Sequence, residues 1–292
     1  MREFADFVMR SRYHAMALAG LFGALSLLFL PFSFLSVGAV ALVGLRKGWL
    51  EGVLAVLGAA ILVAAGWFLI HLRPGLGFPV VLVLWPIALC GAQALRRTES
   101  QGMTLLVVAS LCALFVVSMH ILTGDVTGFW KSWLQRAVSG VPGAALQGFE
   151  RDGTLRLMNG LIAMLLGACT MLSLLLARWW QSLLYNPGGF GPEFARLRLP
   201  LMVLLGVVLV LLVAGYFSQG LLVDLFMISV MMYFFVGLAV IHGVVAIRKL
   251  SWAWALPPYI ALVFLPPYAL MGMALLGASD AFFDFRARAR RA

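Results

Sequence analysis

The feature that most constrains this chain is a succession of long apolar stretches separated by short polar loops. A helix needs about 20 apolar residues to cross the hydrocarbon core of a bilayer, and several stretches reach that length. The stretches are continuous and lack the alternation of polar and apolar residues that a lipid-facing barrel would show. Only 11% of the residues are charged, whereas a soluble domain has about 25%. The sequence therefore predicts an all-α, polytopic transmembrane helical bundle.

We expect about 8–10 membrane segments, including short or broken helices. The run 33–45 is thin for a full crossing and is predicted to be either a short buried helix or a re-entrant element. The run 252–278 contains two Pro-Pro pairs, so it is either one kinked span or a hairpin of two half-length pieces. Full spans are expected at residues 13–30, 49–70, 77–95, 102–122, 155–177, 199–218 and 222–247.

The basic residues predict the orientation. If the N-terminus is cytoplasmic, the pairs Arg46-Lys47, Arg96-Arg97 and Arg248-Lys249, with the segment Arg178 to Arg198, all fall on the cytoplasmic side. Cytoplasmic loops collect Lys and Arg, so we expect this orientation in a bacterial inner membrane. A hairpin at 252–278 would bring the basic C-terminal tail to the same side. Membrane topology also accounts for the net charge of +10 without nucleic acid as a partner, because no basic stripe is interleaved with aromatic residues.

The polar segments divide the chain into two parts. Residues 1–185 are expected to form a six-segment membrane core with an external amphipathic loop at 124–153. In that loop Trp130 and Trp133 recur at helical spacing with apolar neighbours, a pattern typical of an interfacial helix with tryptophan anchors. Residues 186–292 are expected to contain a cytoplasmic Gly/Pro loop, further membrane helices and the basic tail.

Ionisable residues inside membrane spans are the first candidates for function, because burying a charge in hydrocarbon is costly. Asp224, near the start of one span, is either an interfacial carboxylate or a functional one. His242, in the same span, is either a packed neutral histidine or part of a proton relay. The turn-forming residues Asn186, Gly188 and Gly189 predict either a simple turn or a docking or gating loop for a cytoplasmic partner.

No enzyme activity, cofactor or metal site is expected. The chain has no phosphate-cradling glycine loop ending in Lys-Ser/Thr, no G-x-S-x-G elbow and no H-E-x-x-H motif. No residues stand at metal-ligand spacing. Gly44, Gly48 and Gly52 are spaced four apart, which predicts either tight packing within the chain or a docking face for another membrane subunit.

Three short motifs stand along the chain: Gly44-Leu45-Arg46-Lys47-Gly48, Asn186-Pro187-Gly188-Gly189-Phe190, and Leu276-Gly277-Ala278-Ser279-Asp280 followed by Phe283-Asp284-Phe285-Arg286. They resemble motifs of the YybS-like membrane proteins, and the resemblance extends over nearly the whole chain. The first six spans of that family are similar in layout to the substrate-binding subunits of energy-coupling-factor vitamin transporters and to the cell-shape protein MreD. The resemblance implies a transporter-subunit-like core at 1–185 and adds Asp280, Asp284 and Arg286 to the candidate functional residues.

Two functions are expected for such a chain. The first is a transport-related subunit that binds a small solute among its helices and needs an energising partner. The second is a non-transporting scaffold of an envelope or cell-shape assembly. A pocket with polar groups, open to one side, would favour the first, and a filled core with an exposed stripe of small residues would favour the second. The expected partners are the lipid bilayer and either another membrane subunit or a small solute.

Overall fold

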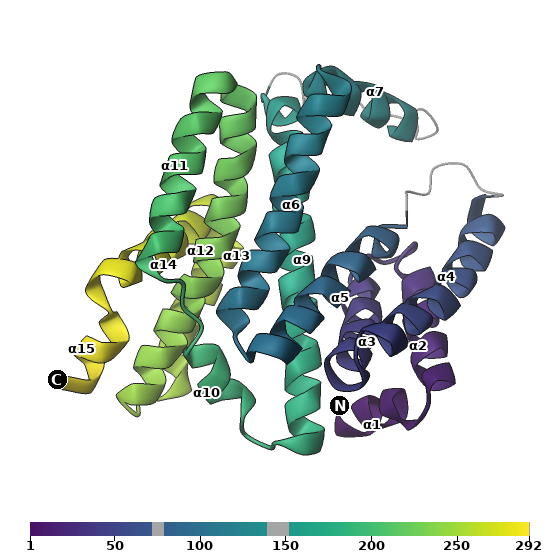
Figure 1. Ribbon diagram of the computed structural model, residues 1–292, viewed down its shortest axis with the longest axis horizontal. Coiled ribbons are helices and arrows are strands. Elements are labelled where there is room, and N and C mark those ends of the chain that lie inside the picture. The colour runs from purple at the N-terminus through teal and green to yellow at the C-terminus, as the bar shows by residue number, and fades with distance from the viewer. Residues whose placement is uncertain (72–78, 139–151, 292) are drawn as a thin grey trace.

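The computed structural model describes residues 1–71, 79–138 and 152–291, and within these ranges it contains fourteen α-helices, one 3₁₀ helix and no strand. The predicted all-α class is confirmed (Figure 1). The first part of the chain forms α1 (Arg2–Arg10), α2 (Arg12–Leu25), α3 (Phe32–Lys47), α4 (Trp49–His71), α5 (Val81–Thr98), α6 (Gln101–Thr123) and α7 (Val126–Val138). The second forms α9 (Thr154–Tyr185), α10 (Phe190–Ala195), α11 (Leu201–Phe217), α12 (Gln219–Ile247), η1 (Trp252–Ala255), α13 (Leu256–Phe264), α14 (Pro266–Phe283) and α15 (Phe285–Arg291).

Four of the described helices, α4, α6, α9 and α12, are long and apolar enough to cross a membrane. Two shorter apolar segments, Leu201–Phe217 and Trp252–Phe264, accompany them. Large apolar side chains point outward from these elements, among them Ile61, which is 71% exposed. An apolar surface of this extent would be unfavourable in water, so these helices support an integral membrane protein. The larger expected number of membrane segments stays a prediction for the shorter helices.

Helix α3 lies inside the first half of the bundle. Every residue from Ser36 to Leu45 is buried, because α2, α4, α5 and α9 all pack on this helix. Its 16 residues give about 24 Å of helix. Of the two alternatives for the run 33–45, the structure therefore has the short buried helix and not the re-entrant element.

The glycines spaced four apart serve this internal packing. Gly44, Gly48 and Gly52 are all buried. A Cβ atom on Gly52 would lie 2.6 Å from a methyl carbon of Leu89 and 3.4 Å from the Cα atom of Gly44. Small residues here let α3, α4 and α5 approach closely. Of the two alternatives, these three glycines therefore have tight packing within the chain, because the chain's own helices cover them.

The stretch 252–278 doubles back on itself. Helix α13 ends before Leu265, and α14 then runs along α12, with Gly277 of α14 beside Gly237 of α12. Tyr259 of α13 and Arg286 of α15 both reach the C-terminal part of α12. The stretch is thus a broken hairpin, not a single kinked span. Figure 1 shows the result: both chain ends and α10 lie at one end of the molecule, and α7 lies at the other.

Candidate functional site

The candidate residues from the sequence occupy two separate places. Asp224 lies on α12 near the α7 end, 18 residues before His242, which corresponds to about 27 Å along a helix. The others gather at the opposite end, around α10. These are Asn186, Gly188, Gly189, His242, Asp280, Asp284 and Arg286.

The loop before α10 is a tight turn. The backbone N–H of Gly189 donates to the carbonyl of Asn186 over 3.0 Å. Gly188 has φ +84°, in the left-handed region that glycine adopts at little cost. The loop is therefore a tight turn that places Phe190 at the start of α10, and the docking or gating role stays a prediction.

An ion pair fastens α10 to α9. The guanidinium group of Arg178 holds both carboxylate oxygens of Glu193, with Nε donating to Oε2 over 2.7 Å, and its Nη1 atom donates to the Gln181 amide oxygen over 2.8 Å. Such a bidentate contact fixes the relative position of the two side chains better than a single hydrogen bond does. The pair sets the position of α10 against the rest of the bundle.

We expect Arg178→Gln to loosen α10 while leaving the bundle folded. Loss of the charge-assisted bonds should cost about 1.5–3 kcal/mol locally, because both side chains are partly shielded from water. The measurement is the rate of tryptic cleavage after Arg196, which should rise. Arg97→Gln, an exposed arginine on α5, is the control and should leave the rate unchanged. Equal rates in Arg178→Gln and the native chain would contradict the assigned role.

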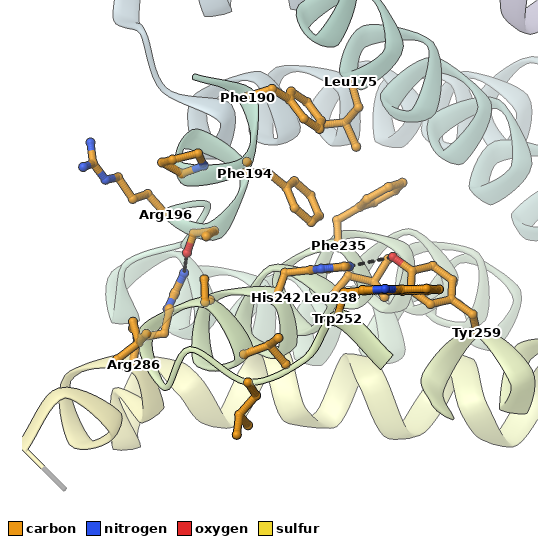
Figure 2. Close-up of a pocket in the computed structure, with 18 of the residues that line it drawn as sticks. Leu175, Phe190, Phe194, Arg196, Phe235, Leu238, His242, Trp252, Tyr259 and Arg286 are labelled. Carbon is orange, nitrogen blue, oxygen red and sulfur yellow. Dashed lines mark hydrogen bonds between the residues drawn. The ribbon is translucent and has the colours of Figure 1, made fainter. Parts of the chain in front are cut away.

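Beside α10 lies a groove of about 780 Å³ between α10, the C-terminal part of α12, η1 and α13. Figure 2 shows Phe190 and Phe194 on one side, Leu238 and Phe235 on α12, and Tyr259 on the other. Most of the lining is apolar or aromatic. Such a wall favours contact with a hydrocarbon chain over a polar solute.

His242 is the polar group on the groove floor. Its Nε2 atom lies 2.7 Å from the Tyr259 hydroxyl, and its ring centroid lies 5.6 Å from that of Phe194. Figure 2 shows the imidazole directed at Tyr259 along this bond. The arrangement corresponds to the packed histidine of the two alternatives. Tyr259 was not singled out from the sequence, because nothing in the spacing indicates a bond across 17 residues.

One end of the groove is basic. Arg196 and Arg290 line it and are exposed, whereas Arg286 is 7% exposed. The Arg286 guanidinium donates to the Asp280 carboxylate over 2.5 Å and to the carbonyls of Ala195 and Leu197 over 2.9 and 2.8 Å. Asp280 therefore neutralises Arg286, and the excess positive charge at the rim comes from Arg196 and Arg290.

Asp284 belongs to the junction between α14 and α15. Its carboxylate accepts from the backbone N–H of Ala287 over 3.0 Å, as a helix-capping residue does. A smaller hollow beside the groove is lined by Asp284 with Arg198 and Arg290. The three residues that the resemblance placed together, Asp280, Asp284 and Arg286, thus meet in space at the tail.

Asp224 is not an interfacial carboxylate in water, as one alternative had it. The residue is 2% exposed. Its carboxyl group accepts a hydrogen bond from Asn159 of α9 and lies within hydrogen-bond distance of His120 of α6. Neither His120 nor Asn159 was among the candidate residues from the sequence. The signal for Asn159 was a polar amide within an apolar run, which is costly in lipid unless it has a partner.

In the described part of the external loop, the position of Trp130 differs from the prediction. Trp130 of α7 is 8% exposed and donates to the Asn159 amide oxygen over 3.2 Å, so it is packed inside and is not a surface anchor. Trp133 is 37% exposed. The rest of the loop that was predicted at 124–153 falls partly on residues 139–151, outside the described residues.

Comparisons with known proteins gave no match, so the groove is the main guide to the function of the protein. No protein-family model matches the sequence, and no curated protein or solved structure matches it. The resemblance to YybS-like proteins therefore stays a prediction. Within residues 1–71, 79–138 and 152–291, no group of three or more His, Cys, Asp or Glu side chains could hold a metal ion.

Proposed function

We propose that this protein is a substrate-binding subunit of a membrane transport system and that its substrate is a phosphate-bearing lipid. One observation carries the proposal: the groove beside α10 combines an apolar wall with two exposed arginines at one end. Its volume of about 780 Å³ is typical of ligand sites. An energising partner would complete the system.

The basic end of the groove and its apolar wall both favour the same kind of molecule. Phe190, Phe194 and Leu238 offer a surface for an acyl or prenyl chain. Arg196 and Arg290 stand where the polar head would lie, and each basic residue near a membrane surface attracts anionic lipid by about 1 kcal/mol. A phosphate head with a hydrocarbon tail satisfies both ends of the groove.

The orientation is part of the proposal. The N-terminus, α10 and the basic tail share one end of the molecule (Figure 1). We place this end at the cytoplasmic face of a bacterial inner membrane, supported by the rule that cytoplasmic loops are rich in Lys and Arg. The groove then opens at the depth of the inner-leaflet head groups, and α7 lies on the outer side.

Blocking the groove should abolish lipid binding. Ala246 lines the groove and is exposed, so Ala246→Trp fills the space without enlarging a buried side chain. Spin-labelled phosphatidylglycerol in phosphatidylcholine vesicles should show an immobilised fraction with the native protein, and most of that fraction should disappear in the variant. Val210→Trp, at an exposed position of α11, is the matched control and should keep it. An immobilised fraction in Ala246→Trp as large as in the native protein would refute the assigned site.

The basic rim should decide the head-group preference. Arg196→Gln and Arg290→Gln should each weaken phosphatidylglycerol binding about five-fold, since about 1 kcal/mol is lost per arginine. Spin-labelled phosphatidylcholine should bind the native protein and these variants alike. Arg97→Gln serves as the control for total charge. Equal loss in all three variants would mean that charge acts non-specifically, and the rim would have no special role.

One observation favours the alternative function, a non-transporting scaffold. Helix α11 packs one half-buried face on α12, and of its 17 residues Ala214 is the buried one. Its other face is exposed and available to lipid or to a partner protein. A photoreactive side chain at Leu209, which is 62% exposed, would test this in native membranes. A defined protein adduct would support the scaffold, and adducts with lipid alone would remove its support.

A further inference from the structure

A buried carboxylate joins the two halves of the membrane bundle. Asp224 of α12 is 2% exposed and sits against Gly160 of α9, where a Cβ atom would lie 2.8 Å from the Asp224 Cα atom. Helix α12 packs here on α6 and α9. A charged side chain in such an apolar contact is costly unless it is paired or protonated.

Two polar side chains meet one oxygen of the Asp224 carboxyl group. Oδ2 lies 2.6 Å from Nδ2 of Asn159 and 2.8 Å from Nε2 of His120. The Asn159 amide is itself held by the indole N–H of Trp130. Oδ1 is buried and has no hydrogen-bond partner in the described structure. Four helices, α6, α7, α9 and α12, thus converge on one group that has an unused oxygen.

We propose that Asp224 and His120 form a proton-binding site that controls how tightly α12 packs against α6 and α9. With one proton the pair has no net charge, whether that proton is on the carboxyl group or on the imidazole. A second proton leaves a neutral acid beside an imidazolium ion, so the buried pair gains a net positive charge and α12 packs less tightly against α6. The proton comes from water and returns to it through His120, whose side chain is 20% exposed.

The ligand is a proton and not a metal ion. The Asn159 amide directs an N–H at the carboxylate, and a cation placed there would meet that N–H instead of an oxygen ligand. In addition, the described residues contain no group of three or more His, Cys, Asp or Glu side chains that could hold a metal ion.

The other charged and titratable groups on the surrounding helices lie outside the contact between Asp224 and His120. Arg156 of α9, Lys131 of α7 and Tyr216 of α11 are exposed on their helices, outside the buried contact. The titratable groups of α10, α13, α14 and α15 lie around the groove at the opposite end of α12, including Tyr259 and Asp280. His120 is therefore the titratable group that faces Asp224 directly.

Infrared difference spectra of the full-length protein in vesicles test the site. On acidification, the native protein should show a buried-carboxyl band that changes together with an imidazole band. Asp224→Asn should remove the carboxyl band. Asp125→Asn, which replaces an exposed carboxylate at the same end and preserves an oxygen that can cap α7, should leave both bands in place. Replacing potassium with sodium in the buffer should change nothing.

A second variant keeps the test decisive if Asp224→Asn does not fold. His120→Gln preserves a donor but removes the titrating partner, so the buried carboxyl band should persist across the whole pH range. A native spectrum without a pH-dependent buried-carboxyl band would overturn the proposal, as would a band unchanged in both variants. A shift with sodium would assign the site to a cation instead.

The proton site goes beyond the proposed lipid binding and can fail separately from it. Ala246→Trp blocks the groove at the opposite end of α12 and should leave both infrared bands unchanged. Loss of lipid immobilisation with intact bands would uphold both sites, and intact immobilisation with absent bands would refute the proton site alone.

Discussion

Replacing Gly237 with alanine should separate α12 from α14 and destabilise the protein by about 3 kcal/mol or more. The two helices make the most extensive contact in the described bundle. A Cβ atom on Gly237 would overlap the carbonyl oxygen of Met273, and one on Gly277 would overlap that of Tyr233. These obstacles are backbone atoms, so no side chain can rotate away. The helices can accept the methyl group only by moving apart.

Gly272→Ala is the matched control, because nothing lies within 4 Å of a Cβ atom at this exposed position of α14, the partner helix. Alanine there should be neutral or stabilise by up to about 1 kcal/mol, the difference in helix propensity. Thermal unfolding in detergent, followed by circular dichroism, compares the two. A Gly237→Ala protein that melts like the native chain would show that α12 and α14 do not approach as closely as described.

Removing Arg286 should release the C-terminal tail. Arg286→Met leaves the Asp280 carboxylate buried and unpaired, together with the carbonyls of Ala195 and Leu197. Breaking one partner of a buried ion pair costs about 3–5 kcal/mol. We expect a lower melting temperature and faster tryptic removal of the tail.

A double variant separates charge from packing. Adding Asp280→Asn to Arg286→Met removes the unpaired buried carboxylate, so part of the lost stability should return. The effects of mutations at residues in direct contact are usually not additive. Arg291→Gln, an exposed change in the same tail, should have no effect on melting. If the double variant were as unstable as the sum of the two single ones, the pair would not interact in the folded protein.

The fold class could be predicted because lipid imposes it. Long apolar runs can bury their backbone hydrogen bonds in a bilayer only as helices or closed barrels, and the runs here lack alternation. The neighbours of each helix could not be predicted, because hydropathy does not distinguish lipid from protein surroundings. The run 33–45 illustrates this limit: Ser36 donates to the carbonyl of Ala19 over 2.7 Å, a contact that places the run inside the bundle and that no local pattern encodes.

The site was predicted unevenly for a similar reason. Turn-forming residues such as Gly188 could be found because their backbone roles are local, whereas Asp284 entered only through the resemblance to a family. The partners of Asp224 could not, since His120 lies 104 residues away and Asn159 lies 65 residues away along the chain. A polar residue in an apolar run indicates that a partner exists, but only the tertiary packing shows which one.

The burial of α3 from Ser36 to Leu45 has a consequence for biogenesis. Its Gly38 packs against the ring of Trp180 in α9, and that tryptophan leaves the ribosome about 140 residues later, or roughly ten seconds at ordinary rates of synthesis. Until then one side of α3 must be covered by lipid, by the insertion machinery or by a chaperone. Chains truncated before α9 are therefore expected to be recognised as unfinished and degraded, although they already contain two of the helices that are long enough to cross the membrane.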